Sequence, residues 1–206
     1  EIILKQTLKF SNPESFNDPF DCNENLLKVN ISKESIEKVF KEIPNNFSQE
    51  QKEKMFKELL NPKIISETLK KKKKEYKISC FSKIYDEVLM WSHYADKHNG
   101  ICVGFDFNYE NYGKFILCPI KYIDEIKSFD GEIEVNSIIM YWLTNKSKRW
   151  SYEKEVRAIA KSQNNEDKEF IDYDKKDIKE IIFGCNVTEE NVNLAIKKIK
   201  DSGIFN

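Results

Sequence analysis

Glycine and proline are scarce in this chain, which contains six and five of them among 206 residues. Such a low content argues against long disordered linkers. No apolar stretch approaches the roughly 20 residues that a helix needs to cross a bilayer, and no signal peptide is recognisable. Because the chain starts at Glu1 and not at methionine, we expect that a leader or N-terminal piece has been removed.

Cysteine pairs are also missing. The five cysteines are scattered, odd in number and never arranged as C-x-x-C. Three of them lie among apolar, strand-like neighbours, where cysteine acts as a small hydrophobic residue. This pattern favours a protein of the reducing cytoplasm over a disulfide framework.

Several well-known signatures are absent as well. The chain has no glycine-rich phosphate loop, no G-x-S-x-G elbow and no cysteine knuckle. These absences argue against P-loop NTPases, Rossmann dehydrogenases, α/β-hydrolases and zinc-knuckle proteins. The formal net charge of -1 gives no general attraction to nucleic acid or to a membrane.

What the chain does contain is enough apolar surface for a core, with 40% hydrophobic and 13% aromatic residues. Strand-like and helical segments follow one another in a pattern that predicts an α+β fold with a mostly antiparallel sheet core. We expect a single domain, 1–206, with a helical insertion at about 32–76. The expected strands cover 2–10, 78–81, 101–106, 115–123, 155–161, 169–173 and 180–183, and the expected later helices cover 87–97, 135–145 and the stretch from 186–188 to 203.

The insertion carries clear helix-start signals. Ser48 with Gln51 forms a capping box, and Asn61 with the proline after it is typical of a cap and first helical residue. The last of these helices ends in five lysines, Lys70–Lys74. This lysine run is either a solvated helix end, favoured by the helix dipole, or a phosphate-binding patch.

The first candidate site is the segment Phe16–Asp21, with the sequence Phe-Asn-Asp-Pro-Phe-Asp. Asn17 and Asp18 flank a turn that proline fixes, and two phenylalanines bracket it. The segment is either an Asx-type turn pinned by buried rings or a rigid backbone that aims Asn17, Asp18 or Asp21 at a ligand.

The second candidate site runs from Trp91 to His98 and contains both histidines of the chain. On a helix, Trp91, Tyr94 and His98 share one side, whereas His93 lies about 140° away from His98. The histidines therefore do not form the i, i+4 pair of a zinc site, and we expect no metal. The rings suit stacking on a nucleobase or nicotinamide, or else they are hydrogen-bonded structural residues.

The third candidate site is the segment Arg149–Arg157. A strand beginning near Glu153 would turn its small apolar residues toward the core and place Glu153, Glu155 and Arg157 on the opposite face. That row is either a solvent face with an ion pair of little energetic value or a carboxylate tuned by Arg157 at the floor of a cleft.

Taken in order, these segments resemble a bacterial family known as domain of unknown function 2971. The resemblance spans nearly the whole chain, although members usually begin with a Tyr-Lys-Tyr-Arg-like segment that is missing here. The family name implies an architecture and no activity. The residues that carry the resemblance are Phe10–Pro13, Phe16–Phe20, Cys80–Ser82, Met90–Ala95, His98–Ile101 and Trp150–Arg157.

A weaker resemblance in topology is to the ADP-ribosyltransferase-type toxins. The shared order is an early loop, a helical insertion, a Ser-bearing strand and a late Glu-x-Arg strand. It implies that NAD is the substrate and that Glu155 or Glu153 stabilises an oxocarbenium-like sugar. It also implies that Trp91, Tyr94 or His93 stacks on or bonds to the nicotinamide.

The resulting hypothesis is a NAD-using ADP-ribosyltransferase-like or NAD glycohydrolase-like toxin or defence effector with no resident cofactor. One alternative is a metal-independent nuclease or phosphodiesterase, with His93 or His98 as acid and base and Lys70–Lys74 holding phosphate. Another is a non-enzymatic ligand-sensing or partner-binding module. We expect a small nucleotide-like ligand and no membrane, and nucleic acid has weak support. The predicted site residues are Glu155, His93, Glu153 and Arg157 for catalysis, and Asn17, Asp18, Ser82, Trp91, Tyr94 and His98 for ligand binding.

Overall fold

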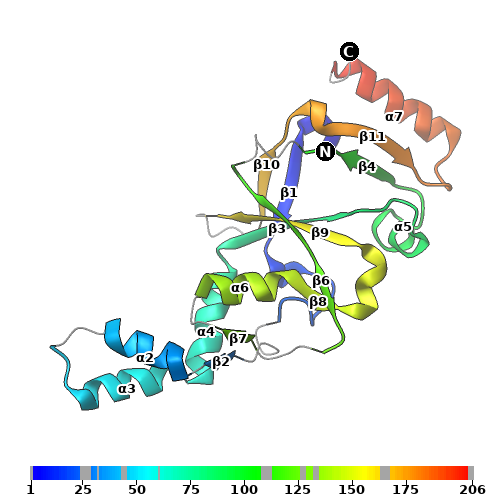
Figure 1. Cartoon of the computed structure of the whole chain (residues 1–206). Helices are drawn as coiled ribbons and strands as arrows, with labels where there is room; N and C mark the ends of the chain where they lie inside the picture. The colour runs from blue at the N-terminus through cyan, green and yellow to red at the C-terminus, as the bar shows by residue number, and fades with distance from the viewer. Residues whose placement is uncertain are drawn as a thin grey trace.

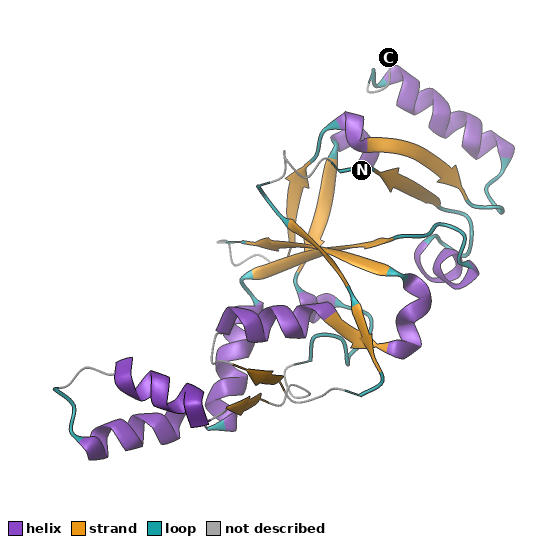
Figure 2. Ribbon diagram, in the orientation of Figure 1, coloured by secondary structure: helices purple, strands orange, loops and turns teal. Residues whose placement is uncertain are grey.

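The computed structural model of the protein has the expected α+β fold, built around one antiparallel sheet (Figures 1 and 2). The structure describes residues 2–23, 29–31, 33–42, 46–59, 61–107, 113–125, 129–131, 135–162 and 168–203. The sheet has the strand order β10, β1, β3, β9, β5, and every neighbouring pair runs antiparallel. Its strands are β1 (Thr7–Ser11), β3 (Tyr76–Ser82), β5 (Ile116–Pro119), β9 (Glu155–Lys161) and β10 (Lys168–Asp172).

Smaller strand pairs surround this sheet. The pair β4 and β11 runs antiparallel, whereas β2 pairs with β7 and β6 with β8 in parallel. The bounds of these strands are β2 (Val29–Ile31), β4 (Ile101–Phe105), β6 (Lys121–Ile123), β7 (Phe129–Gly131), β8 (Asn145–Ser147) and β11 (Ile178–Phe183).

The expected helical stretch before β3 contains α2, α3 and α4, and Figure 1 shows α2 and α3 lying away from the sheet. The capping box is confirmed, since Ser48 and Gln51 exchange hydrogen bonds of 2.8 and 3.2 Å between side chain and backbone. The Asn61 side chain also caps α4 as expected. The helices are α1 (Ile2–Lys5), α2 (Lys33–Glu42), α3 (Gln49–Leu59), α4 (Pro62–Lys73), α5 (Val88–Tyr94), α6 (Val135–Thr144) and α7 (Glu189–Asp201), with short 3-10 turns at η1 (Pro13–Ser15), η4 (Lys148–Glu153) and η5 (Lys175–Asp177).

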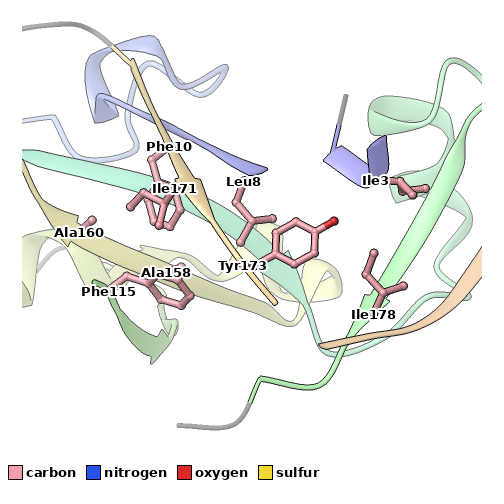
Figure 3. Close-up of a cluster of buried hydrophobic side chains, with 9 residues drawn as sticks. All are labelled: Ile3, Leu8, Phe10, Phe115, Ala158, Ala160, Ile171, Tyr173 and Ile178. Atoms are coloured by element: carbon pink, nitrogen blue, oxygen red, sulfur yellow. The ribbon is translucent and has the colours of Figure 1, made fainter. Parts of the chain in front are cut away.

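Both faces of the sheet are covered by apolar clusters. Successive residues of a strand point to opposite faces, so β9 contributes to both clusters. On β9, Ala158 points into a core that also contains Leu8 and Phe10 of β1 (Figure 3). The next residue, Ile159, points to the other side and packs with Ile139 of α6. The sheet therefore has one core toward β4 and β11 and another toward α6 and α4.

Several expected boundaries are wrong. The N-terminal strand begins only at Thr7, because a helical turn and Gln6 at φ 53° come before it. The stretch 115–123 is divided into β5 and β6 after Pro119, which ends an edge strand as proline tends to do. The expected helix over 87–97 stops at Tyr94, because the three residues 96–98 all have positive φ.

The strand expected over 155–161 is confirmed as β9, but it does not extend back to Glu153. Glu153 closes the 3-10 turn η4, and Lys154 then takes a left-handed conformation with φ 45° before β9 begins at Glu155. The interpretation of these charged residues as a solvent-exposed face of the strand is wrong. Glu153, Glu155 and Arg157 are 3%, 5% and 0% exposed.

The lysine run is not a uniformly solvated helix end. Lys73 is buried and its ammonium nitrogen lies 5.1 Å from the centre of the Trp142 ring, which is a favourable cation–π distance. Its neighbour Lys72 forms a 2.7 Å ion pair with Glu75. Among the described helices, none is long and apolar enough to span a membrane.

The close contact between the end of β11 and the turn after α5 gives a test of this fold. A Cβ atom at Gly184 would lie 2.1 Å from the carbonyl oxygen of His98, whereas one at Gly113 would meet nothing within 4 Å. We expect Gly184→Ala to lower the free energy of unfolding by about 1–3 kcal/mol, because backbone must move. Urea denaturation should show little change for the control Gly113→Ala, and equal stability of the two variants would contradict the contact.

Candidate functional site

A buried network of charged side chains lies where the three candidate segments meet. At its centre is Arg157 on β9, whose side chain is fully buried. Its Nε donates to Glu155 at 2.7 Å, and its terminal nitrogens donate to the Asp21 carboxylate, the Leu143 carbonyl and the Cys22 sulfur. The guanidinium therefore ties β9 to the first candidate segment and to the end of α6.

Lys146 on β8 is the second cation of the network. Its ammonium group donates to Glu153 at 2.5 Å and to Glu155 at 2.8 Å, and lies 3.8 Å from Asp21. Two cations thus face three carboxylates, all nearly removed from solvent. Charges in such a place are tolerated because each has an opposite charge and hydrogen bonds.

The network holds Glu155 and Lys146 in the ionised state. Burial by itself would raise the pKa of Glu155, but the positive charges of Arg157 and Lys146 and their hydrogen bonds outweigh it and lower this pKa to about 2. Burial would likewise lower the pKa of Lys146, yet the Glu155 and Glu153 carboxylates hold it above its usual value. Glu155 is therefore a fixed anion and not a proton donor at neutral pH.

Two tyrosines extend the network toward other elements. The Tyr94 hydroxyl on α5 donates to the free oxygen of Glu153 at 2.8 Å, and burial together with this bond raises the pKa of Tyr94. The Tyr122 hydroxyl on β6 accepts the backbone N–H of Glu155 at 2.8 Å. Tyr94 thus connects the second candidate segment to the third.

The histidines lie apart from this centre. His98 is outside α5, its ring stacks near Trp91 with centroids 6.5 Å apart, and its Nε2 lies 3.0 Å from the Ser92 hydroxyl. The Trp91 indole donates to the Tyr85 carbonyl at 2.6 Å. His93 is exposed and meets the edge of Tyr94. The shared helix side expected for Trp91 and His98 is wrong, because α5 ends at Tyr94. His98 lies in the following turn, where its N–H donates to the Trp91 carbonyl at 3.2 Å.

The remaining predicted residues divide between structure and surface. Asp18 accepts the backbone N–H of Phe20 at 2.9 Å, which is the expected Asx-type turn. The expected burial of the bracketing rings is wrong for Phe20, which is 68% exposed. Ser82 donates to the Glu153 carbonyl at 2.7 Å and so supports the network from β3. Asn17 is exposed beside Asp18.

A large cavity lies between the sheet and the pair of β4 and β11, with a volume of about 930 Å³. Three of the residues predicted to bind a ligand, Ser82, Trp91 and Tyr94, contribute to its lining. Asn17, Asp18, His93, His98 and the catalytic candidates on β9 and η4 do not. The structure therefore brings five of the predicted residues to one network but not to one pocket, namely Ser82, Tyr94, Glu153, Glu155 and Arg157.

A second hollow, here called the Phe20 groove, shares no lining residue with the large cavity. Its volume is about 450 Å³, and it adjoins a smaller cavity of about 240 Å³ that Asp21 and Lys146 help to line. The groove is lined by Asp18, Phe20, Ser147, Arg149, Trp150 and Tyr152.

Sequence reasoning missed Lys146 and Tyr122, which complete the network. Neither has a local signal, because Lys146 stands in a polar segment after α6 and Tyr122 in a short strand, and their partners are distant in the chain. Asp21 carried a signal, since it ends the first candidate segment. The described residues contain no group of three or more His, Cys, Asp or Glu side chains suited to a metal ion.

Residues 90–158 match the model of a family described as a protein of unknown function, DUF2971. The match covers about a third of the chain, including most of α5, all of η4 and the first half of β9. It supports the resemblance noted from the sequence, while the topological resemblance to ADP-ribosyltransferase-type toxins gains no support. No curated protein and no solved structure matches the chain.

The lowered pKa of Glu155 predicts how stability depends on pH. This pKa falls from an ordinary 4.5 to about 2 on folding, so the contribution of Glu155 is present above pH 4.5 and is lost as the pH falls toward 2. We expect Glu155→Gln to cost about 3 kcal/mol at pH 7, because it leaves buried cations without a partner. Urea unfolding should show a much smaller difference from wild type near pH 3, and an equal difference at both pH values would refute the linkage.

Proposed function

We propose that this protein is a small-molecule-binding module. In this proposal the ligand occupies the large cavity between the five-stranded sheet and the β4 and β11 pair. The observation that carries the proposal is the cavity itself, whose 930 Å³ falls within the roughly 300–1,000 Å³ of ligand pockets. Tyr94, which contributes to the cavity lining, donates a hydrogen bond to Glu153 of the buried charge network. This anchoring favours a pre-formed site.

The lining indicates the chemistry of the ligand. Aromatic and aliphatic side chains such as Phe81, Phe105 and Ile181 form most of the wall. The charged residues of the lining are balanced, because Lys83 and Lys198 are matched by Asp106 and Glu180. A ring-bearing, mostly apolar molecule with one polar end fits this combination.

A NAD-using transferase or glycohydrolase, acting as a toxin or defence effector, has less support. Glu155 is 5% exposed and both of its oxygens accept hydrogen bonds from cations. A carboxylate in that state has no free oxygen to stabilise a sugar cation. The observation in favour of this alternative is that Glu153 is one hydrogen bond away from the large cavity, through Tyr94.

The nuclease alternative has less support still. The lysine run ends α4, and α4 and α5 lie at opposite ends of β3 in Figure 1. His98 is already engaged with Ser92. A phosphate held at the lysines would therefore be far from both histidines.

Filling the cavity tests the proposal. Ala195 on α7 contributes to the lining, whereas Asn193 is exposed and about 200° away around the helix. We expect the wild type to enhance the fluorescence of 8-anilinonaphthalene-1-sulfonate, an apolar ring system with an acidic group. Ala195→Phe should remove most of that enhancement by occupying the cavity, and the control Asn193→Phe should retain it. Unchanged fluorescence in Ala195→Phe with a normal urea transition would count against the cavity as the site.

The same preparations separate the module from the enzyme. We expect no release of nicotinamide when the wild type is incubated with NAD. Nicotinamide release that disappears in Glu153→Gln would support the transferase or glycohydrolase alternative. The matched control is Glu125→Gln, which changes an exposed carboxylate outside the network and should leave any nicotinamide release unchanged.

A further inference from the structure

The Phe20 groove is a second hollow with a chemistry of its own. None of the six residues that line it also lines the large cavity. One wall comes from the turn around Phe20 and the other from η4, so the groove joins the first and third candidate segments of the sequence. It does not depend on the proposed function.

The walls of the groove are held in place by the buried charge network. Phe20 precedes Asp21, Ser147 follows Lys146, and Tyr152 precedes Glu153 in the chain, and each of these charged partners belongs to the network. Three wall residues are thus fixed by neighbours whose charges are locked together. Such pre-organisation lowers the entropic cost of binding a ligand.

The turn that carries Phe20 is itself rigid. The Asp18 side chain accepts the Phe20 N–H, the Asp18 carbonyl accepts the Asp21 N–H at 3.1 Å, and the Asn23 amide donates to the Pro19 carbonyl at 3.0 Å. Despite these constraints, the Phe20 ring is 68% exposed. A large ring that faces solvent from a constrained backbone can serve as a stacking surface.

The groove combines rings with one free cation. Phe20, Trp150 and Tyr152 supply three aromatic rings, and the last two have centroids 6.0 Å apart. Arg149 is exposed, and within the described parts of the chain its guanidinium makes no hydrogen bond or ion pair. By contrast, the adjacent Lys148 is paired with Asp124 at 3.2 Å.

From this combination we infer that the Phe20 groove binds a nucleoside monophosphate. The base stacks on Phe20 and Trp150, since every nucleobase offers a flat π-face. The phosphate accepts hydrogen bonds from Arg149, whose planar donors suit phosphate oxygens. Asp18 supplies an acceptor for an amino group on the base. A volume of about 450 Å³ suits one nucleotide and not a polymer.

The test compares AMP with adenosine by isothermal titration calorimetry. Wild type should bind AMP more tightly than adenosine, because only AMP reaches Arg149 with a charge. Arg149→Gln should weaken AMP binding about tenfold and leave adenosine unchanged. Phe20→Ala should weaken both ligands about tenfold by removing a stacking surface, and its fold is expected to survive because the ring is exposed.

Lys148→Gln is the matched control, since it removes the same charge from the neighbouring position outside the groove. It should leave the binding of both ligands unchanged. Equal affinities of wild type for AMP and adenosine, an equal loss in Lys148→Gln and Arg149→Gln, or no binding of either ligand would each overturn the inference. Tryptophan fluorescence supplies a second readout, because AMP stacked on Trp150 should quench it in wild type, and Phe20→Ala should need about tenfold more AMP for the same quenching.

Discussion

The burial of one guanidinium, that of Arg157, constrains the centre of this molecule. A charge on the inner face of a sheet is tolerated only when opposite charges and acceptors surround it. Here those partners come from the turn at Asp21, the end of α6 and β9 itself, and Lys146 adds a second cation. Segments more than a hundred residues apart in the chain must therefore meet in one arrangement for the charges to be satisfied.

The same constraint decides what the carboxylates can do. Glu155 and Glu153 share Lys146, Glu155 also accepts from Arg157 and Glu153 from Tyr94, so each carboxylate oxygen already accepts a hydrogen bond in the folded protein. A general acid needs a proton near neutral pH and an electrostatic catalyst needs an open face toward the substrate. The network provides neither at Glu155. The role of the network is structural, because it holds Tyr94 of the large cavity and Trp150 of the Phe20 groove in place.

Much of the fold was predictable because its signals are local. The cap at Asn61, the capping box at Ser48 and the strand 155–161 depend on neighbours a few residues away, and all three are present. The end of α5 was not predictable, because none of the three left-handed residues Asp96, Lys97 and His98 is a glycine. The site was predicted in part, since Glu153, Glu155 and Arg157 were recognised while Lys146 was missed. The polar segment around Lys146 predicts a solvent-exposed lysine, and only tertiary contacts bury it.

Glu153 shows how the buried charge network connects the large cavity to the Phe20 groove. One of its oxygens accepts from Tyr94, which lines the large apolar cavity, and the other accepts from Lys146, whose ammonium lies 5.1 Å from the Trp150 ring of the Phe20 groove. Because Lys146 is also bound to Glu155, and Glu155 to Arg157, none of these groups can turn without breaking a buried charged hydrogen bond. Such bonds are worth roughly 1.5–3 kcal/mol each. The network therefore fixes the two hollows relative to each other, and each can keep its own shape and its own ligand chemistry.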